Sequence, residues 1–562
     1  MATSLAGIVI VAFEAGSALA GQSTRTYHRD VAPIVARHCT SCHRADGAAP
    51  FSLTRFDEVR ARARLIVEVT TKRYMPPWKP APAGGGPFVG ERRLSDAEIA
   101  TIAAWVAAGA PAGDAADAGQ SRADAPGASL VGQPDLIVQL PEPYDLAAGG
   151  ADVFRNFVVP IPVRTEKYVA AIEFRPEGSR AIHHVNLRLD RSSSSRELDA
   201  EDPLPGYEGP IGVNARYPDG YFLGWTPGQQ PTRAAPGMAW RLAPGTDLVL
   251  QLHLRKTGKP ERVQPSIAFY FTDIAPTRLP LAMRLGKQNI DIAPGATAVA
   301  RDSYRLPVSV ELHAIHPHAH YRARTVKAVA SLPDGTIRPL IEIDDWDFNW
   351  QDIYRYTTPV MLPRGTVITS EFTYDNTADN PRNPDSPPRR VRFGQNSSDE
   401  MGDLWLQVLP ASDRERAELY EDFYPKTLAE DVAGYEMLLS ADPDHPGYHS
   451  DVALLLARLG QGKRAIGHLQ QAIALKPDFG AAHYNLATLY AAGGRLPEAE
   501  GAFRAALSVR PAHAETHNNL GVVLKAMGRL DEAIDHFKRA VDLDPDNTEA
   551  QTNLSIALKL KG

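Results

Sequence analysis

The middle of the chain, residues 135–411, consists of short apolar stretches separated by Pro, Gly, Asp and Asn. Several of them combine β-branched and aromatic residues: FVVPIPV, YVAAIEF, HHVNLRL, DLVLQLHL, SIAFYF, TVKAVASL, TVITSEFTY and DLWLQVL. Runs of this length and composition are typical of strands. The pattern predicts an all-β sandwich or jelly-roll architecture, long enough to form two subdomains, residues 135–285 and 286–411.

The C-terminal part of the chain is periodic. A spacing of 34 residues separates Pro477, Pro511 and Pro545, and likewise Gly460, Gly494 and Gly528. A 34-residue helix-turn-helix period resembles tetratricopeptide repeats, so we expect an α-helical solenoid over residues 446–562 after a helical connector over residues 412–445. The repeats predict docking of a protein partner or self-association, and the sequence leaves both open.

The N-terminal part has helical patterning. In LSDAEIATIAAWVAAGAP a Ser occupies a cap position, the apolar residues follow helical spacing, and Gly-Ala-Pro ends the segment. We expect a small all-α domain over residues 27–112. The Ala, Gly and Asp-rich residues 113–134 then predict a flexible linker.

Composition restricts the class of protein. The 562 residues carry a formal charge of -7, which gives no nucleic-acid signature. The only two cysteines, Cys39 and Cys42, cannot form a disulfide framework. Residues 1–20 resemble a secretory signal peptide, although no Lys or Arg precedes the apolar run, and we expect a periplasmic or secreted protein. No later run is long enough to span a membrane.

The two cysteines belong to the motif HCTSCH, residues 38–43. In an exported protein, C-x-x-C-H indicates one covalent haem c, with thioethers from Cys39 and Cys42 and iron ligation by His43. A zinc knuckle would need a second ligand pair, and a redox dithiol would need a βαβ pattern; neither follows. Met75 in KRYMPPWKP is the candidate sixth iron ligand, because the prolines hold its loop extended.

Histidines in the β region form three clusters. The first is His183-His184, and both can reach one metal only at a bulge or strand end because consecutive strand residues face opposite ways. His253 in DLVLQLHL would complete a three-imidazole site, which suits copper. The third cluster is HAIHPHAH, in which His318 and His320 share one strand face as a chelating pair.

A soft third ligand would stabilise Cu(I) beside that pair. Met401 in NSSDEMGDLWLQVL stands at the polar entrance of an apolar run, where a core methionine is not expected. The neighbouring His316 and, on the other strand face, His313 are more typical of structural or outer-sphere groups.

The order His-His, lone strand His, His-x-His and then SSDEM resembles the type II copper, ascorbate-dependent monooxygenases, the family of peptidylglycine α-hydroxylating monooxygenase and dopamine β-monooxygenase. The segments DWDFNWQDIYRY and YDNTADNPRNP are similar to bacterial members joined to a cytochrome c. The resemblance implies two copper ions: an electron-transfer copper held by His183, His184 and His253, and an O2-binding copper held by His318, His320 and Met401. It also implies two jelly-roll subdomains with the coppers facing across a cleft.

The implied activity is a monooxygenase that uses O2 to hydroxylate an activated C-H bond of a small molecule or peptide. Electrons would reach the copper domain through the tethered haem from an external donor. An alternative is a non-catalytic haem and copper electron-transfer or scaffold protein. A zinc hydrolase is disfavoured because no H-E-x-x-H motif or carboxylate base accompanies the histidines.

Overall fold

A computed structural model describes residues 24–44, 49–117, 132–192, 194–208, 211, 214–218, 220–221, 223–229, 231, 233–545 and 547–562. The predicted signal peptide and most of the predicted linker lie outside them. The chain divides into two compact units, one of which holds Lys79–Glu91 and Ser129–Gly562 and the other the remainder. No helix among the described residues combines the length and apolar character needed to cross a bilayer.

The first unit is helical. Its elements are η1 (Tyr27–Val31), α1 (Ala32–His38), α2 (Phe56–Ala61), α3 (Ala63–Thr71), α4 (Asp96–Ala107) and η2 (Ala115–Asp117). The α4 helix begins as predicted, because the Ser95 side chain accepts from the Glu98 backbone N–H in a capping box. Trp105 is fully buried at the centre of the core and donates to the Pro111 carbonyl over 3.0 Å.

The predicted range of the helical domain, residues 27–112, includes a segment that packs elsewhere. Residues Lys79–Glu91 belong to the second unit, where Gly85 bridges to Ile341 and Phe88 to Tyr356. The Val89 N–H donates to the Arg355 carbonyl over 2.7 Å. The segment therefore runs along β17 (Ile337–Ile343) and β18 (Tyr354–Leu362) as an irregular extended stretch. No periodicity in this Pro and Gly-rich sequence indicated that contact.

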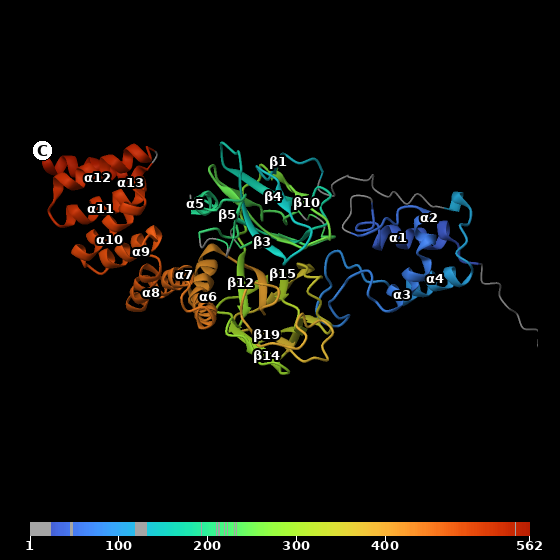
Figure 1. Cartoon of the computed structure of the whole chain (residues 1–562). Helices are drawn as coiled ribbons and strands as arrows, with labels where there is room; N and C mark the ends of the chain where they lie inside the picture. The colour runs from blue at the N-terminus through green and yellow to red at the C-terminus, as the bar shows by residue number, and fades with distance from the viewer. Residues whose placement is uncertain are drawn as a thin grey trace, which may run out of the picture. The chain divides into compact units, whose positions relative to one another are not determined.

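The β region starts with a first group of strands. They are β1 (Leu136–Gln139), β2 (Tyr144–Leu146), β3 (Val153–Pro160), β4 (Lys167–Arg175), β5 (Ile182–Asp190), β6 (Tyr207–Glu208), β7 (Leu223–Trp225), β8 (Trp240–Leu242), β9 (Asp247–Leu254), β10 (Glu261–Val263) and β11 (Ser266–Thr272), with helix α5 (Ser194–Glu201). They form the antiparallel sheets β1-β11-β4-β8 and β6-β3-β9-β5-β7 (Figure 1). Apolar side chains of both sheets make up one buried core.

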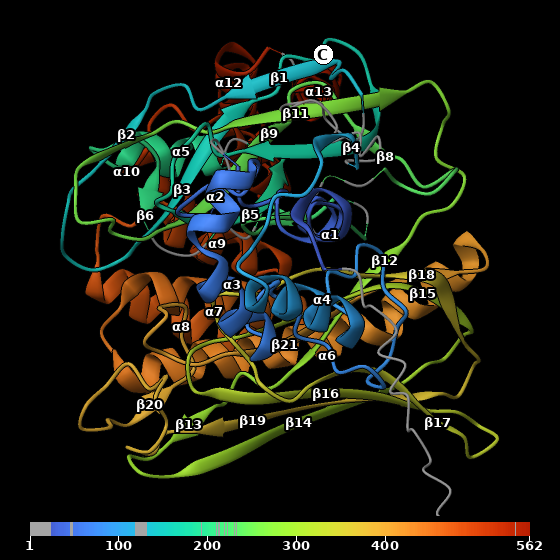
Figure 2. The same ribbon diagram turned by 90° about the vertical axis from the view of Figure 1, so that its right-hand side faces the viewer.

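A second group of strands follows. They are β12 (Leu281–Gly286), β13 (Asp291–Ile292), β14 (Thr297–Arg305), β15 (Val310–Ala319), β16 (Ala323–Ser331), β17 (Ile337–Ile343), β18 (Tyr354–Leu362), β19 (Val367–Asp375), β20 (Val391–Arg392) and β21 (Gly402–Pro410). They form the sheets β12-β21-β15-β18 and β14-β19-β16-β17, seen as two layers in Figure 2. Gly402 of one sheet lies against Tyr374 and Phe372 of the other, so the core lies between the sheets.

The two groups have the same strand order. When the eight principal strands of each group are numbered along the chain, both groups contain one sheet of order 1-8-3-6 and one of order 2-7-4-5. Short strand β6 and the pairs β2-β10 and β13-β20 are additions to this plan. The β region therefore consists of two successive groups of strands with one topology.

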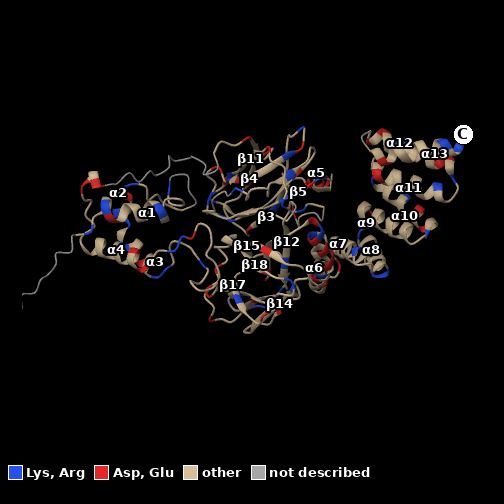
Figure 3. Ribbon diagram, turned by 180° about the vertical axis from the view of Figure 1, so that it is seen from behind, with Lys and Arg blue, Asp and Glu red and all other residues tan. Residues whose placement is uncertain are grey.

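Helices complete the second unit. They are α6 (Asp413–Ala441), α7 (Pro446–Arg458), α8 (Gly462–Leu475), α9 (Gly480–Ala492), α10 (Leu496–Val509), α11 (Ala514–Ala526), α12 (Leu530–Leu543) and α13 (Thr548–Lys561). Gly460, Gly494 and Gly528 have φ values of +73°, +72° and +79°, which favour glycine and explain its 34-residue recurrence. Positive and negative residues are both scattered over these helices (Figure 3), and Arg529, just before α12, forms an ion pair with Glu500 of α10 at 2.6 Å.

Candidate metal centre

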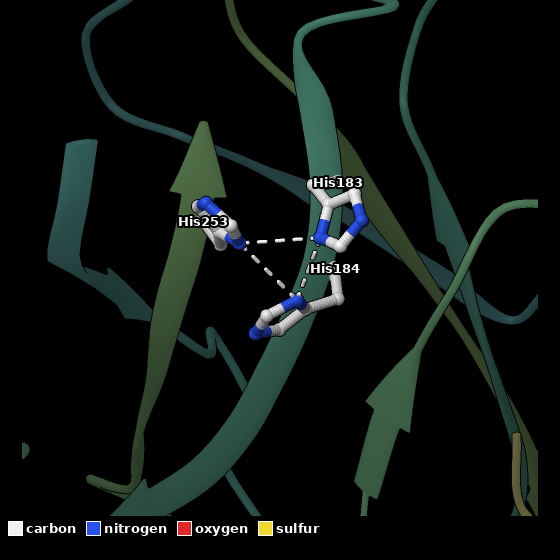
Figure 4. Close-up of side chains that lie close together, drawn as sticks. All are labelled: His183, His184 and His253. Carbon is white, nitrogen blue, oxygen red and sulfur yellow. Dashed lines mark hydrogen bonds between the residues drawn. The ribbon is translucent and has the colours of Figure 1, made fainter. Parts of the chain in front are cut away.

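Three histidines of the first β group converge on one point (Figure 4). The Nδ1 atom of His183 lies 3.1 Å from that of His184 and 3.2 Å from that of His253, and the His184 and His253 Nδ1 atoms are 3.4 Å apart. At a metal–nitrogen bond of about 2.0 Å, such spacings give angles of about 100–115° at a shared ion. The three nitrogens therefore match a metal site with a tetrahedral or trigonal arrangement.

A β-bulge makes this convergence possible. Strands β5 and β9 pair His184 with His253 and Ile182 with Leu254, and the register shifts between Ile182 and His184. His183 is the extra residue, so its side chain escapes the strict alternation of a strand. The bulge predicted from adjacent histidines is present.

A carboxylate orients His253 from outside the cluster. The His253 Nε2–H donates to Asp152 Oδ2 over 2.9 Å, which leaves Nδ1 with its lone pair toward His183 and His184. The Phe154 ring stacks on His253 with centroids 4.0 Å apart. Sequence reasoning missed Asp152, since only the pairing of β3 with β9 brings it near His253.

Burial keeps these imidazoles neutral. Desolvation, with smaller contributions from His253 and Arg255, lowers the pKa of His183 to about 3. Desolvation also lowers the pKa values of His184 and His253, and the Asp152 carboxylate opposes that change at His253. Neutral imidazole is the form that binds a metal.

The second histidine set consists of His318 near the end of β15 and His320, which directly follows β15, in the second β group. Gln351 Oε1 accepts a hydrogen bond from His318 Nδ1, and the Asp399 carbonyl accepts one from His320 Nδ1 over 3.2 Å. The Nε2 atom of each ring is then the nitrogen with a lone pair, and the ring centroids are 5.2 Å apart. Burial lowers the pKa of His318 to about 4 and that of His320 well below its usual value.

Met401 stands opposite His320. The β15–β21 pairing joins His318 to Asp403 and Ala319 to Gly402, so the next facing positions are His320 and Met401. The buried Glu400 carboxylate accepts from the backbone N–H groups of His320, Arg322 and Met401 at 2.6, 2.9 and 3.1 Å. This carboxylate holds the two strand ends together, a role that the sequence did not indicate.

The two remaining histidines of β15 have different surroundings. His316 donates from Nδ1 to the Asp352 carbonyl over 3.0 Å and faces the same cavity as His318 and His320. His313 lies at a bulge of β15 and is not part of the cavity lining. Its Nε2 is 3.0 Å from the Glu311 carboxylate. The bulge at His313 interrupts the alternation from which its separation by strand face was predicted, so that prediction is wrong as stated, although His313 is not among the residues that line the cavity.

Both clusters border one cavity of about 500 Å³. Its lining includes His184, His318, His320 and Met401. The Phe348 ring, 2% exposed, lies between the clusters, with its centroid 5.2 Å from that of His183 and 5.5 Å from that of His320. Phe348 comes from a loop after β17, and nothing in the sequence indicated that it would separate two histidine sets.

The cavity extends from the histidines to the connector helix. Farther along its wall, the Arg188 guanidinium lies 5.1 Å from the Tyr217 ring centroid, and Tyr217 packs edge-on against Trp405 at 5.6 Å. Residues of α6 and α7, among them Tyr424 and Arg458, close the far end. The space beside the histidines is therefore polar and aromatic and large enough for a small ligand.

The HCTSCH motif of the first unit follows the end of α1. The Cys39 and Cys42 thiols form no disulfide, and burial, together with Cys42, raises the pKa of Cys39 to about 12. The His43 Nδ1–H donates to the Phe51 carbonyl over 3.0 Å, which leaves Nε2 available. Met75 follows α3, half-buried, and among the described residues no interaction joins it to Cys39, Cys42 or His43.

Comparisons with known proteins concern the C-terminal helices. Residues 478–546 match the family model of the tetratricopeptide repeat, which confirms the predicted repeats. Two solved structures described as crystal structures of MamA are 21% identical; each covers 27% of this chain, and 84% and 78% of the solved chains are covered, with a TM-score of 0.24 in both cases. No curated protein matches. Tetratricopeptide repeats indicate protein–protein interaction.

Proposed function

We propose that this protein is a copper-dependent monooxygenase of the type II, ascorbate-dependent class, with a covalent c-type haem as its electron entry. One observation carries the proposal: His184 of one histidine set and His318, His320 and Met401 of the other border the same cavity. An electron-transfer site and an oxygen-insertion site must serve one reaction, so they are expected to border one cavity. Two independent structural metal sites would not need to share one.

The donor sets fit copper. Three neutral imidazole nitrogens within 3.4 Å of one another match a first copper ion. Two imidazoles and a thioether, from His318, His320 and Met401, match a second ion that must be stable as Cu(I). When bound, copper would supply one-electron transfer and activation of O2.

The chain's own groups hold these donors in place. Asp152 fixes the ring of His253, and Gln351 and the Asp399 carbonyl fix His318 and His320. The Phe348 ring packs against both sets, next to His183 and His320. The strand order 1-8-3-6 and 2-7-4-5 supports a jelly-roll assignment for both β groups.

The residues of HCTSCH fit a covalent haem. Both thiols are free of a disulfide, and His43 has Nδ1 engaged by the Phe51 carbonyl, as an axial ligand requires of its second nitrogen. Met75 is the candidate for the other axial position. The haem would carry electrons from an external donor in the periplasm to the copper domain.

A metal and oxygen measurement tests the proposal. We expect copper-reconstituted, haem-loaded protein to bind two β-domain copper ions per haem and to consume O2 when a substrate is present. His318→Ala and Met401→Ala should abolish that uptake. His313→Ala is the matched control, because His313 is a strand histidine that does not face the cavity. Uptake unchanged by His318→Ala would instead support a non-catalytic electron-transfer or scaffold protein.

A further inference from the structure

Two histidine pairs in the helical repeats have no role in the proposed reaction. His449 of α7 and His468 of α8 lie with their Nδ1 atoms 2.9 Å apart, and His517 of α11 and His536 of α12 show the same separation. Each pair joins the two helices of one repeat, and all four side chains are half-buried. The pairs are 68 residues apart, which is two repeat periods.

In each pair, a backbone carbonyl binds the first ring at Nε2, the nitrogen that does not face the partner ring. The His449 Nε2–H donates to the Pro443 carbonyl over 3.0 Å, and the His517 Nε2–H donates to the Pro511 carbonyl over 3.1 Å. A neutral imidazole protonated at Nε2 has its lone pair on Nδ1, so that lone pair points at the partner ring. A backbone carbonyl in this position is a common outer-sphere partner of a metal-binding histidine.

The second ring needs only a tautomer change to become a ligand. In the hydrogen-bonded pair, His468 donates from Nδ1 to the His449 Nδ1 lone pair. If the His468 proton moves to Nε2, both Nδ1 lone pairs face one point and no proton is lost overall. Burial lowers the pKa values of His468, His517 and His536, so these rings are neutral at pH 7 and do not repel a cation.

We propose that each of these two pairs is a two-imidazole chelate for a divalent copper ion, completed by water. A nitrogen separation of 2.9 Å and bonds of about 2.0 Å give an angle of about 90° at the ion. That angle suits the tetragonal geometry of Cu(II), and copper is also the tightest-binding divalent ion of the first row. The Nδ1 atoms of His183, His184 and His253 are 3.1–3.4 Å apart, which corresponds to a tetrahedral or trigonal ion instead.

The repeat between the two pairs contains a natural control. His483 of α9 occupies the equivalent position and donates to the Pro477 carbonyl over 2.9 Å. The position that pairs with it, however, is Ala502 of α10. His483 therefore has the orienting contact but no second imidazole, and it should not hold an ion by this means.

Counting bound copper tests the proposal independently of catalysis. In equilibrium dialysis of the full chain against Cu(II), we expect His468→Ala and His536→Ala each to bind one ion fewer than the wild type, and the double variant to bind two fewer. His483→Ala should leave the count unchanged. O2 uptake by the β domain should be unaffected, which separates this proposal from the proposed function.

If the folded double variant binds as many ions as the wild type, the pairs are hydrogen bonds between helices and the proposal is wrong. If the double variant fails to fold, Ala502→His decides, because it places a second imidazole opposite His483. One additional ion in that variant supports the proposal. An unchanged count overturns it.

Discussion

The two β groups share a strand order but place their histidines on different strands. In the first group the histidines lie on adjacent strands β5 and β9 of the 2-7-4-5 sheet. In the second group they lie at the end of β15 of the 1-8-3-6 sheet, opposite the residue that precedes β21. The repeated topology therefore supplies two rigid frames, and local features of single strands decide where each site lies.

The two sites also differ in which ring nitrogen is available. The Nδ1 atoms converge in the first group, with His253 oriented by a carboxylate at Nε2. In the second group Gln351 and a backbone carbonyl engage Nδ1, and Nε2 is left. A charged partner raises the basicity of a histidine ligand more than a neutral one does. The first site is therefore expected to favour the more oxidised ion and the second, with its thioether, the more reduced ion.

The largest expected effect is the loss of one ion from one group only. His253→Ala removes a member of the three-nitrogen set, and His318→Ala removes one of the two imidazoles of the other set. Each variant should lose one β-domain copper ion per chain and keep the other, because the two donor sets come from different pairs of sheets. Metal analysis checks the count, and loss of both ions in either variant would show that the two sites are one cooperative unit.

Met401→Leu tests whether a soft thioether ligand distinguishes the second site from the first. Leucine keeps the apolar volume but removes the thioether, so Cu(I) affinity at the second site should fall by roughly tenfold or more, about 1.4 kcal/mol. The affinity of the first site should not change. Competition with a Cu(I) chelator measures both. Equal Cu(I) affinity in the variant and the wild type would exclude Met401 as a ligand.

Removing the orienting groups should have smaller effects. Asp152→Asn keeps a hydrogen-bond acceptor for His253 but removes the charge, and loss of such a partner lowers metal affinity by about 10–100-fold. Gln351→Leu at His318 removes a neutral partner, so we expect a loss nearer the lower end of that range. If Gln351→Leu lowers metal affinity at the His318 site more than Asp152→Asn lowers it at the His253 site, the expected difference between a neutral and a charged partner is wrong.

Residue patterns could predict the elements and the grouping of the histidines. Strand-length apolar runs, the 34-residue period and the Ser95 cap all correspond to observed elements. The adjacent His183 and His184 required a bulge or a strand end to face one point, and the structure has the bulge. The alternation of His316, His318 and His320 indicated a common face, and all three line the cavity.

Groups that act across the fold could not be predicted. Asp152 reaches His253 through the pairing of β3 with β9, 101 residues away along the chain. Phe348 meets both histidine sets only because a loop of the second group crosses toward the first. Such contacts depend on sheet register and loop path, and short-range patterns carry no information on either.

The smallest expected effect concerns the segment Lys79–Glu91, which packs on the second β group. Lys79 lies 3.2 Å from Asp345, whose pKa is lowered to about 2 by its hydrogen bond with Arg382 and by Lys79. Because that carboxyl is largely exposed, Lys79→Met should lower the free energy of unfolding of the second unit by less than about 1 kcal/mol.

The pH dependence of this difference has a definite sign. A carboxyl with a lowered pKa contributes stability above its ordinary pKa and loses that contribution as the pH falls through the lowered value. The wild type and Lys79→Met should therefore differ at pH 5, and the difference should shrink below pH 4 and vanish only below pH 2. Denaturant unfolding followed by circular dichroism measures the difference, with Arg301→Met, an exposed Arg partner of Glu371, as the control for a surface ion pair outside the segment. A difference that persists below pH 2 would mean that Lys79 stabilises the segment through its methylene packing and not through its ion pairs with Asp345 and Asp347.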